Sequence, residues 1–219
     1  MNTSQMNNKQ MNNKQMNINT GFEMTEVERQ HSALSTITNM LIGRRWISDD
    51  KINHLKTLIE NGTNEIIDTT FILENNYKIA IKFYNAKLNT LKNDGEIDSF
   101  LAKYPEYHKI FIVNDIAPKA EKQIADSKNN EVFKIMEIIR DISKHHLVPK
   151  HILLTKEDAA KFMEEYKLKK KDMGRIYVDD PMARYLYAQK DDIIQIIRET
   201  ITSGYSTYYR LVVPGSIYN

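Results

Sequence analysis

Hydrophobic residues recur along the chain with two different periods, and the first of them is helical. Leu34, Ile37 and Leu41 fall on one face of a helix, and Gly43 suits the left-handed residue that ends such a helix. Ser48 can cap a second helix, and Trp46 is expected to pack between the two. The apolar face of that second helix consists of Ile52, Leu55, Leu58 and Ile59. The first periodic segment therefore predicts a pair of helices.

A strand pattern follows. The stretch "FILENNYKIAIKFYN" predicts two strands with a polar turn at Asn75–Asn76, and "KIFIVN" predicts a strand covered on both faces. A short helix is predicted at Asp94–Tyr104, and Pro118 can begin another. The β-branched residues of "VFKIMEIIRDI" favour a strand over its second half, up to Ile142. This alternation of helices and strands predicts an α/β domain over residues 25–142.

The rest of the chain, residues 143–219, has the pattern of a small α+β module. Ile152–Leu154 predicts a short strand, and Thr155 can cap a helix with Ala159, Phe162, Met163 and Tyr166 on its inner side. Asp179 or Asp180 can cap a further short helix that has Pro181 in its first turn. The stretches "IIQIIRE" and "YSTYYRLVV" predict two strands joined by a turn containing Ser203–Gly204.

Composition narrows the class of protein. The chain of 219 residues has no cysteine, which excludes disulfides, thiolate nucleophiles and cysteine-ligated zinc. Its net charge is +2, so contacts with nucleic acid would have to come from a local patch. The repeated MNNKQ unit predicts a disordered, low-complexity tail over residues 1–24. With no apolar run long enough to span a membrane and a polar N-terminus, we expect a soluble intracellular protein.

Candidate chemistry is sparse. His145, His146 and His151 have no metal-motif spacing, and Pro149 separates them, so we expect structural hydrogen bonding without a metal or cofactor. Ser203 and Ser206 lie in no nucleophile motif, and no glycine-rich phosphate loop occurs. The basic run Lys167–Asp172 could contact phosphates, but it follows a helix and is more typical of a solvated helix end.

A metal-dependent nuclease is one alternative. The strand "YKIAIKFY" places Lys82 where some nucleases carry a water-activating lysine. The position of the metal-binding acid is occupied by Ala80, however, and only Asp68 and Glu74 lie nearby. Without the central carboxylate we expect no catalysis.

The stretch "DDPMARYLYAQKDD" also lacks catalytic features. Asp180 and Pro181 are a helix start, and Met182, Tyr185 and Leu186 follow with the spacing of a packed face. Arg184 lies off that face and can pair with a carboxylate inside the module or on a partner. We therefore expect this stretch to support the fold and to contact a partner.

An ordered series of motifs runs through the second module: "HHLVPKH", "TKE", "YKL", "RI", "DDPMARY", "IIR" and "YYRLV". In this order and spacing the module resembles the fifth subunit of eukaryotic-type multisubunit RNA polymerases, whose archaeal counterpart consists of this module alone. The first domain, about Leu34 to Ile142, resembles the family's jaw domain more loosely, through "GRRWIS" and "IFIVN" before "APKA". The chain departs from the family at "ETITSG", where the family usually has a proline, and at "KDD", where it often has a basic–glycine pair.

The resemblance implies a noncatalytic polymerase subunit with a nuclease-like jaw fold that lacks catalytic residues. The second module would dock on the largest subunit, with Arg184, Arg198 and Tyr208 as contacts, while Leu147, Pro149 and His151 would shape the fold. The loop at Ala117–Ala120 would lie near downstream duplex DNA. Pro118 would lie in this loop, and Lys119 and Lys122 would contact DNA phosphates without recognising the base sequence.

The resemblance also implies a place in the cell and a set of partners. The partners would be the largest and other polymerase subunits, with no membrane and no homo-oligomer. The divergence and the Asn-rich tail suggest a large DNA virus or a divergent eukaryote. The location would be the nucleus for a cellular protein, and the virion or host cytoplasm for a viral one. A standalone duplex-DNA-binding protein is the other alternative, and it predicts binding that weakens steeply with salt.

Overall fold

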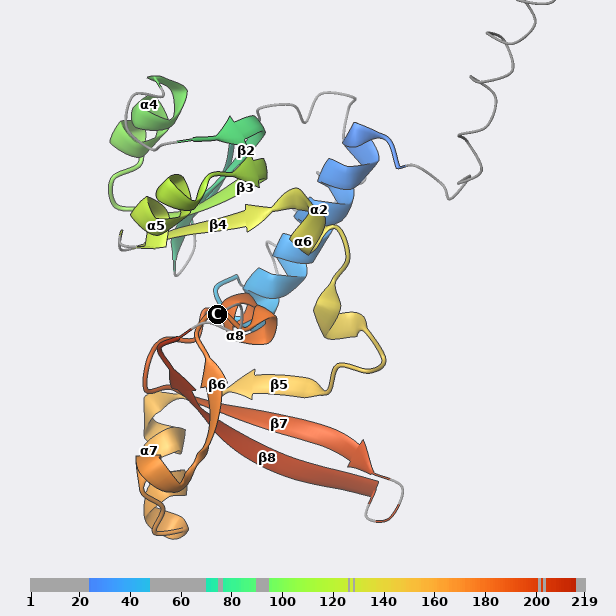
Figure 1. Ribbon diagram of the computed structural model, residues 1–219, viewed down its shortest axis with the longest axis vertical. Helices are drawn as coiled ribbons and strands as arrows, with labels where there is room; N and C mark the ends of the chain where they lie inside the picture. The colour runs from blue at the N-terminus through green and yellow to red at the C-terminus, as the bar shows by residue number, and fades with distance from the viewer. Residues whose placement is uncertain are drawn as a thin grey trace, which may run out of the picture.

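The computed structural model describes residues 24–47, 70–74, 77–89, 95–125, 127, 129–200, 202 and 204–215 (Figure 1). The predicted second helix from Ser48, the turn at Asn75–Asn76 and nearly all of the predicted tail lie outside these residues. The helices of the described part are α2 (Glu26–Gly43), α4 (Gly95–Lys103), α5 (Pro118–Ala125), α6 (Ile135–Ile138), α7 (Lys156–Glu165) and α8 (Pro181–Tyr185), with 3₁₀ turns at Ile142–Lys144 and Lys170–Asp172. The strands are β1 (Thr70–Glu74), β2 (Lys78–Leu88), β3 (His108–Ile116), β4 (Asn130–Lys134), β5 (Lys150–Leu153), β6 (Gly174–Tyr177), β7 (Ile193–Thr200) and β8 (Gly204–Val213).

The first sheet has the order β1-β2-β3-β4 and is covered on both faces. Strands β2, β3 and β4 run parallel, with β1 antiparallel at one edge, as the predicted hairpin requires. Side chains alternate across β3, so Ile110 and Ile112 pack on the side of α2 and α6. Phe111 and Val113 pack on the opposite side, against α4 and α5. The predicted doubly covered strand and the predicted α/β class are confirmed.

Helix α2 begins and ends through two local motifs. Thr25 and Glu28 form a capping box, in which Glu28 accepts from the Thr25 N–H at 2.7 Å. At the other end the Trp46 N–H donates to the Leu41 carbonyl and the Arg45 N–H to the Ile42 carbonyl, which is a Schellman motif. The predicted left-handed residue was Gly43, and this prediction is wrong. The left-handed residue is Arg45, with φ 61°, because the helix continues through Gly43 before it turns.

The segment after β4 corrects a second prediction. The chain forms its strand at Asn130–Lys134 and then turns into the short helix α6, where a strand had been expected. Ile135 and Ile138 are one helical turn apart and both enter the core beneath α2. The Ser32 hydroxyl on α2 also donates to the Ile139 carbonyl at 2.7 Å. Burial against α2 therefore outweighs the strand preference of these β-branched residues.

The second sheet has the order β5-β7-β8-β6. Helix α7 covers one face, where Phe162 and Met163 pack near Ile193 and Leu211. Thr155 caps α7 and Asp180 caps α8, as predicted. Strand β6 was not predicted; it pairs in parallel with β8. Tyr166 was expected on the inner side of α7 but is 61% exposed, because the helix ends at that residue.

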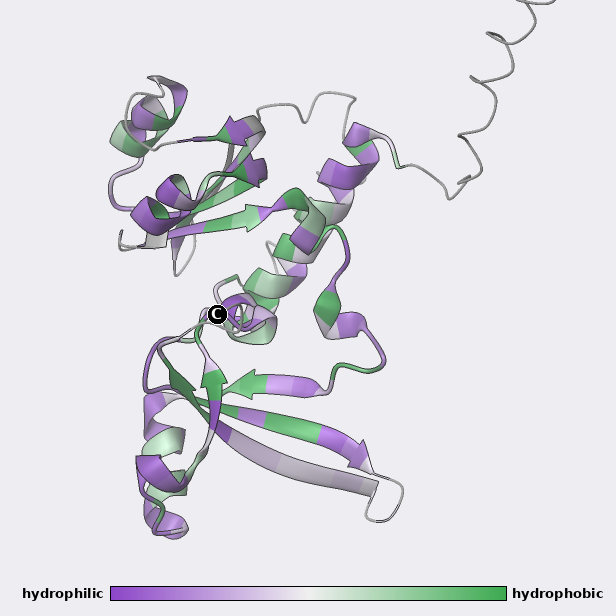
Figure 2. Cartoon of the chain, viewed as in Figure 1, coloured by the Kyte–Doolittle hydropathy of each residue, from purple (hydrophilic) through white to green (hydrophobic). Residues whose placement is uncertain are grey.

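One hydrophobic core joins the two halves of the chain. Helix α2 contributes Leu34, Ile37 and Leu41, and these residues share a cluster with Met182 and Leu186 at α8. The same cluster reaches the inner face of the second sheet through Ile194, Ile196 and Val212. In Figure 2 the hydrophobic colouring follows the central strands and lower α2, while most of β8 is pale. The two sheets are thus held together through α2 and α8.

A buried ion pair fixes this junction. The Arg44 guanidinium binds both oxygens of Glu131 on β4, at 2.6 and 2.8 Å. It also donates to the carbonyls of Tyr185 and Arg184 in α8, each at 2.8 Å. His108 Nε2 on β3 lies 2.6 Å from Glu131 Oε1. Arg44 therefore connects α2 to the first sheet and to the second module at once.

The surroundings of the pair exclude water. The Arg44 side chain is only 1% exposed, and its guanidinium lies 4.8 Å from the ring centre of Trp46 and 5.3 Å from that of Tyr187. Burial by itself would raise the pKa of the Glu131 carboxyl. The charge of Arg44 and the hydrogen bonds from His108 and Arg44 outweigh burial, so that this pKa lies below its usual value. Both partners are consequently charged inside the junction.

We expect Glu131→Gln to lower the free energy of unfolding by about 3 kcal/mol, because it leaves the Arg44 charge buried without a counterion. Urea denaturation of the full chain at neutral pH measures this change. Glu121→Gln is the matched control, since Glu121 is exposed on α5, and we expect it to cost less than about 0.5 kcal/mol. Equal stabilities of the two variants would contradict the role of the pair.

The lowered pKa of Glu131 also predicts how the stability of the chain changes in acid. Its contribution to stability is present above the usual value of 4.5 and is lost as the pH falls through the lower pKa of the folded state. We therefore expect the wild-type chain to lose stability more steeply than Glu131→Gln below that value. Denaturation curves collected as a function of pH test this difference.

Candidate partner-docking site

The hairpin of β7 and β8 extends beyond its own sheet (Figure 1). Strand β5 pairs with β7 only at Ile194–Ile197, and β6 pairs with β8 only at Arg210–Val213. The described hairpin is therefore two-stranded where Arg198–Thr200 pairs with Gly204–Ser206, while Tyr208 lies opposite Ile196, which still pairs with β5. Gly204 adopts a φ of +72° where β8 begins, a conformation that favours glycine. The outer end of the hairpin thus has fewer strand neighbours than the rest of the sheet.

Aromatic and charged side chains cover the outer hairpin. Tyr205 is 67% exposed and Tyr208 is 51% exposed. The Arg198 guanidinium lies 6.0 Å from the ring centre of Tyr208, on the same face of the ribbon. The structure thus brings two of the three predicted docking residues together. Exposed tyrosines beside an arginine are the residue types that most often anchor protein interfaces.

The backbone edge of β8 is also open along the outer hairpin. Val212 exchanges hydrogen bonds with Asp191 and Asp192, at 2.9 and 2.8 Å, so its peptide groups face the β7 side. Because these directions alternate along a strand, the peptide groups of Tyr205 and Thr207 face the opposite side. Strand β6 does not reach these two residues. An extended segment of another chain could pair there by strand addition.

Arg184, the third predicted docking residue, lies at the junction between the two halves of the chain. Its guanidinium donates to Glu137 at 3.3 Å and to the Val132 carbonyl at 2.7 Å, and lies 4.9 Å from the Phe133 ring centre. Its side chain remains 32% exposed. Glu137 belongs to the first domain, so the carboxylate that pairs with Arg184 is not inside the second module as one alternative predicted, and a carboxylate on a partner stays a prediction.

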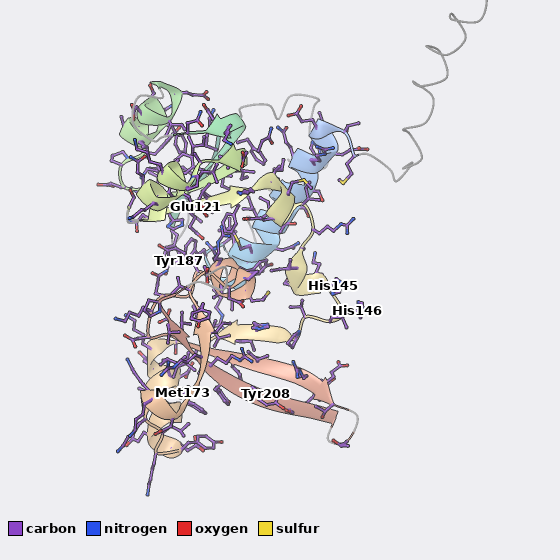
Figure 3. The ribbon with its side chains drawn as sticks, in the orientation of Figure 1. Glu121, His145, His146, Met173, Tyr187 and Tyr208 are labelled. Carbon is purple, nitrogen blue, oxygen red and sulfur yellow. The ribbon has the colours of Figure 1, made fainter. Side chains whose placement is uncertain are left out.

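The proposed DNA-proximal residues lie on α5. Pro118 is its first residue, as predicted, and Lys119 and Lys122 are exposed, while Ala120 and Ile124 pack against the sheet. Neither lysine has an ion-pair partner among the described residues. Figure 3 shows the neighbouring Glu121 on the same helix. The outer side of α5 can therefore contact phosphates with two lysines but carries no strong positive field.

The histidines form no metal cluster in the part of the chain that the structure describes. His145 and His146 stack at 4.7 Å and lie at the outer end of the loop before β5 (Figure 3). His151 points inward, with Nδ1 2.7 Å from the Pro149 carbonyl, and burial lowers the pKa of its imidazole. Leu147 was expected to shape the fold, but it is 75% exposed and does not pack in the core.

The residues of the nuclease alternative have structural contacts. Ala80 is fully buried against the α4 side of the sheet, and the Lys82 amine lies 2.5 Å from Glu96. Asp68, Ser203 and the side chain of Glu74 lie outside the described residues. Within the described ranges, no helix is long and apolar enough to cross a membrane.

Comparison with known proteins identifies the class. Residues 140–212 match the family model of the RNA polymerase Rpb5 C-terminal domain. DNA-directed RNA polymerase subunit Rpo5 of Thermofilum pendens is 47% identical over 75 residues, which are 34% of this chain and 94% of that protein. The chain belongs to the RNA polymerase subunit 5 family.

Two longer relatives extend the match beyond the C-terminal module. DNA-directed RNA polymerase subunit 5 of Acanthamoeba polyphaga mimivirus is 29% identical over 188 residues, covering 82% of this chain and 90% of the relative. The subunit rpabc1 of RNA polymerases I, II and III from Dictyostelium discoideum is 36% identical over 109 residues. This second match spans 48% of the chain and about half, 55%, of the relative.

The position of Arg184 leads to a prediction about stability. We expect Arg184→Glu to lower the free energy of unfolding by about 1–2 kcal/mol, because it removes the bond to the Val132 carbonyl and places a like charge beside Glu137. Urea denaturation measures the loss. The double variant Arg184→Glu/Glu137→Arg restores opposite charges and should regain part of it. A double variant no more stable than Arg184→Glu would contradict the ion pair.

Proposed function

We propose that this chain is a noncatalytic subunit of a multisubunit DNA-directed RNA polymerase. Its C-terminal domain, residues 143–219, docks on the largest subunit, and its N-terminal domain, residues 25–142, lies beside downstream duplex DNA. The observation that carries the proposal is the outer β7–β8 hairpin, exposed on both faces and within the residues that match the family model. Catalysis belongs to other subunits in this proposal, and the chain needs no cofactor.

Docking would add a strand of the partner beside the hairpin. A strand of the largest subunit beside β8 would satisfy the open peptide groups of Tyr205 and Thr207. Burying Tyr208 with Arg198 would supply an aromatic anchor and a guanidinium for a carboxylate of the partner. The outer end of the hairpin would thereby gain a further strand beside β8.

The N-terminal domain would have the family's nuclease-like jaw fold without catalytic residues, and would need few DNA contacts. Lys119 and Lys122, next to Pro118, would contact phosphates and position the duplex without reading its sequence. The net charge of +2 agrees with this arrangement, because the assembly would hold the subunit in place. The chain would act as a single copy in the nucleus of a cell or, for a virus, in the virion or host cytoplasm.

Affinity purification from the native source, with quantitative mass spectrometry, tests the assembly. We expect two very large polymerase subunits to copurify in a one-to-one ratio with this chain. Recovery of the chain alone or with unrelated proteins would overturn the proposal. The companion subunits would also name the polymerase.

The double variant Arg198→Glu/Tyr208→Ala should reduce incorporation at least about tenfold, because it removes the anchor and reverses the charge beside it. Tyr166→Ala is the matched control, since Tyr166 is an exposed tyrosine of the same module at the C-terminal end of α7. Copurified large subunit per tagged chain is the measurement, and circular dichroism monitors folding. Equal incorporation of variant and control would refute docking through this face.

The lysines of α5 give a prediction for the assembled polymerase. Lys119→Glu/Lys122→Glu should weaken binding to downstream duplex DNA and reduce the slope of log affinity against log salt by about 2. Titration of labelled duplex at several salt concentrations measures both. Tight, steeply salt-dependent binding by the purified chain alone would instead favour the standalone DNA-binding alternative.

A further inference from the structure

A cleft lies at the junction of the two halves, separate from the outer hairpin. Its volume is about 770 Å³, and its walls come from the end of α2, the loop before β5, β5 itself and α8. These elements adjoin one another in Figure 1. The function proposed above does not use this cleft.

The floor of the cleft is apolar. Met182 of α8 and the C-cap residue Leu186 are buried, and Ile42, Val148 and Leu153 pack partly against the same core cluster. Part of each of these last three side chains remains accessible. A small apolar side chain of another molecule could therefore be buried there at a gain of roughly 25 cal/mol for each Å² removed from water.

The rim of the cleft is basic. Arg45 and Lys150 are exposed and have no hydrogen-bonded or ion-pair partner among the described side chains. Lys144 lies 3.7 Å from Asp141, whose carboxylate already accepts hydrogen bonds from Asn39 and Ser143. Among the described residues that line the cleft, none is an aspartate or a glutamate. Its charge therefore favours an anionic occupant.

The backbone conformation of Arg45 is sterically unfavourable for an arginine. It is the left-handed residue of the Schellman motif, where glycine carries no steric penalty and an arginine costs roughly 1 kcal/mol. The motif directs Arg44 into the buried ion pair and leaves Arg45 at the rim. A cation held at a strained position beside an apolar floor is consistent with use of its charge.

We propose that this cleft binds a short acidic and apolar segment of another protein. An apolar side chain of the segment would enter the floor between α2 and α8, and flanking carboxylates would pair with Arg45 and Lys150. His151 and Leu153 share a face of the sheet with Ile196, which lies opposite Tyr208. The cleft therefore lies on the same face of the second sheet as Tyr208 but apart from the outer hairpin, and a partner seated on the hairpin could leave it accessible.

Fluorescence polarisation on the full chain tests the proposal with three labelled probe peptides. The first alternates Asp with Leu and Phe, the second has Lys at every Asp position, and the third has Ser at every apolar position. At near-physiological salt we expect the first probe to bind at least about tenfold more tightly than either of the others. Equal binding of the three probes, or none at the highest usable protein concentration, would overturn the proposal.

Paired charge reversals locate the binding. Arg45→Glu/Lys150→Glu should weaken binding of the first probe at least about tenfold. Lys161→Glu/Lys190→Glu is the matched control, because it makes the same change in net charge at exposed lysines outside the cleft. Equal effects of the two double variants would refute the site. Circular dichroism shows whether each double variant is folded. If a variant does not fold, the comparison of the three peptides on the wild-type chain still tests the proposal.

Sedimentation distinguishes a second copy of the chain as the occupant. We expect a monomer at the protein concentrations used for the probes. A dimer that Arg45→Glu/Lys150→Glu abolishes would show that the cleft is a self-association surface and would overturn the proposal. None of these measurements depends on incorporation into a polymerase, so their failure and failure of the proposed function are separable.

Discussion

The fold depends on one buried charge. Arg44 satisfies Glu131 on the first sheet and two carbonyls of α8, so a single guanidinium ties three segments far apart in sequence. Its planar fork suits this role, because five fixed donors can bind a carboxylate in bidentate fashion and still reach other acceptors. A buried pair of this kind adds little net stability compared with an apolar replacement, but losing either partner is severe. Its contribution is consequently to fix one relative placement of the two modules.

That placement explains the shape of the shared core. Helix α2 covers one face of the first sheet and meets α8 with its C-terminal turns, so hydrophobic packing is continuous from Ile110 to Ile194. Arg184 adds a second, more exposed connection through Glu137 and the Val132 carbonyl. Contacts on both sides of α8 make the joint resistant to rotation. The exposed hairpin and α5 are thereby presented at a defined separation, as the proposed link between protein and DNA would require.

Much of this fold could be predicted from periodicity, but its junction could not. The doubly covered strand, Pro118 at the start of α5 and Asp180 as the cap of α8 all follow from local chemistry. The turn from β4 into α6 did not, because burial of Ile135 and Ile138 beneath α2 is a tertiary effect that β-branching conceals. Arg44 and Glu131 are 87 positions apart, and no local pattern marks them as partners. For the docking site, Arg198 and Tyr208 share a face because of strand register, whereas Arg184 is drawn inward by contacts that periodicity cannot show.

The same junction also separates the two surfaces on which the proposals depend. Because Arg44 turns inward, its neighbour Arg45 must face the cleft, so the rim charge is a consequence of how the fold is fixed. The hairpin, in contrast, receives no support from the junction beyond Ile194–Ile197 and Arg210–Val213. It can therefore adjust to a partner without disturbing the core, while the cleft keeps its geometry. A rigid cleft favours recognition of one particular segment, and an adjustable hairpin favours broad burial on a large partner.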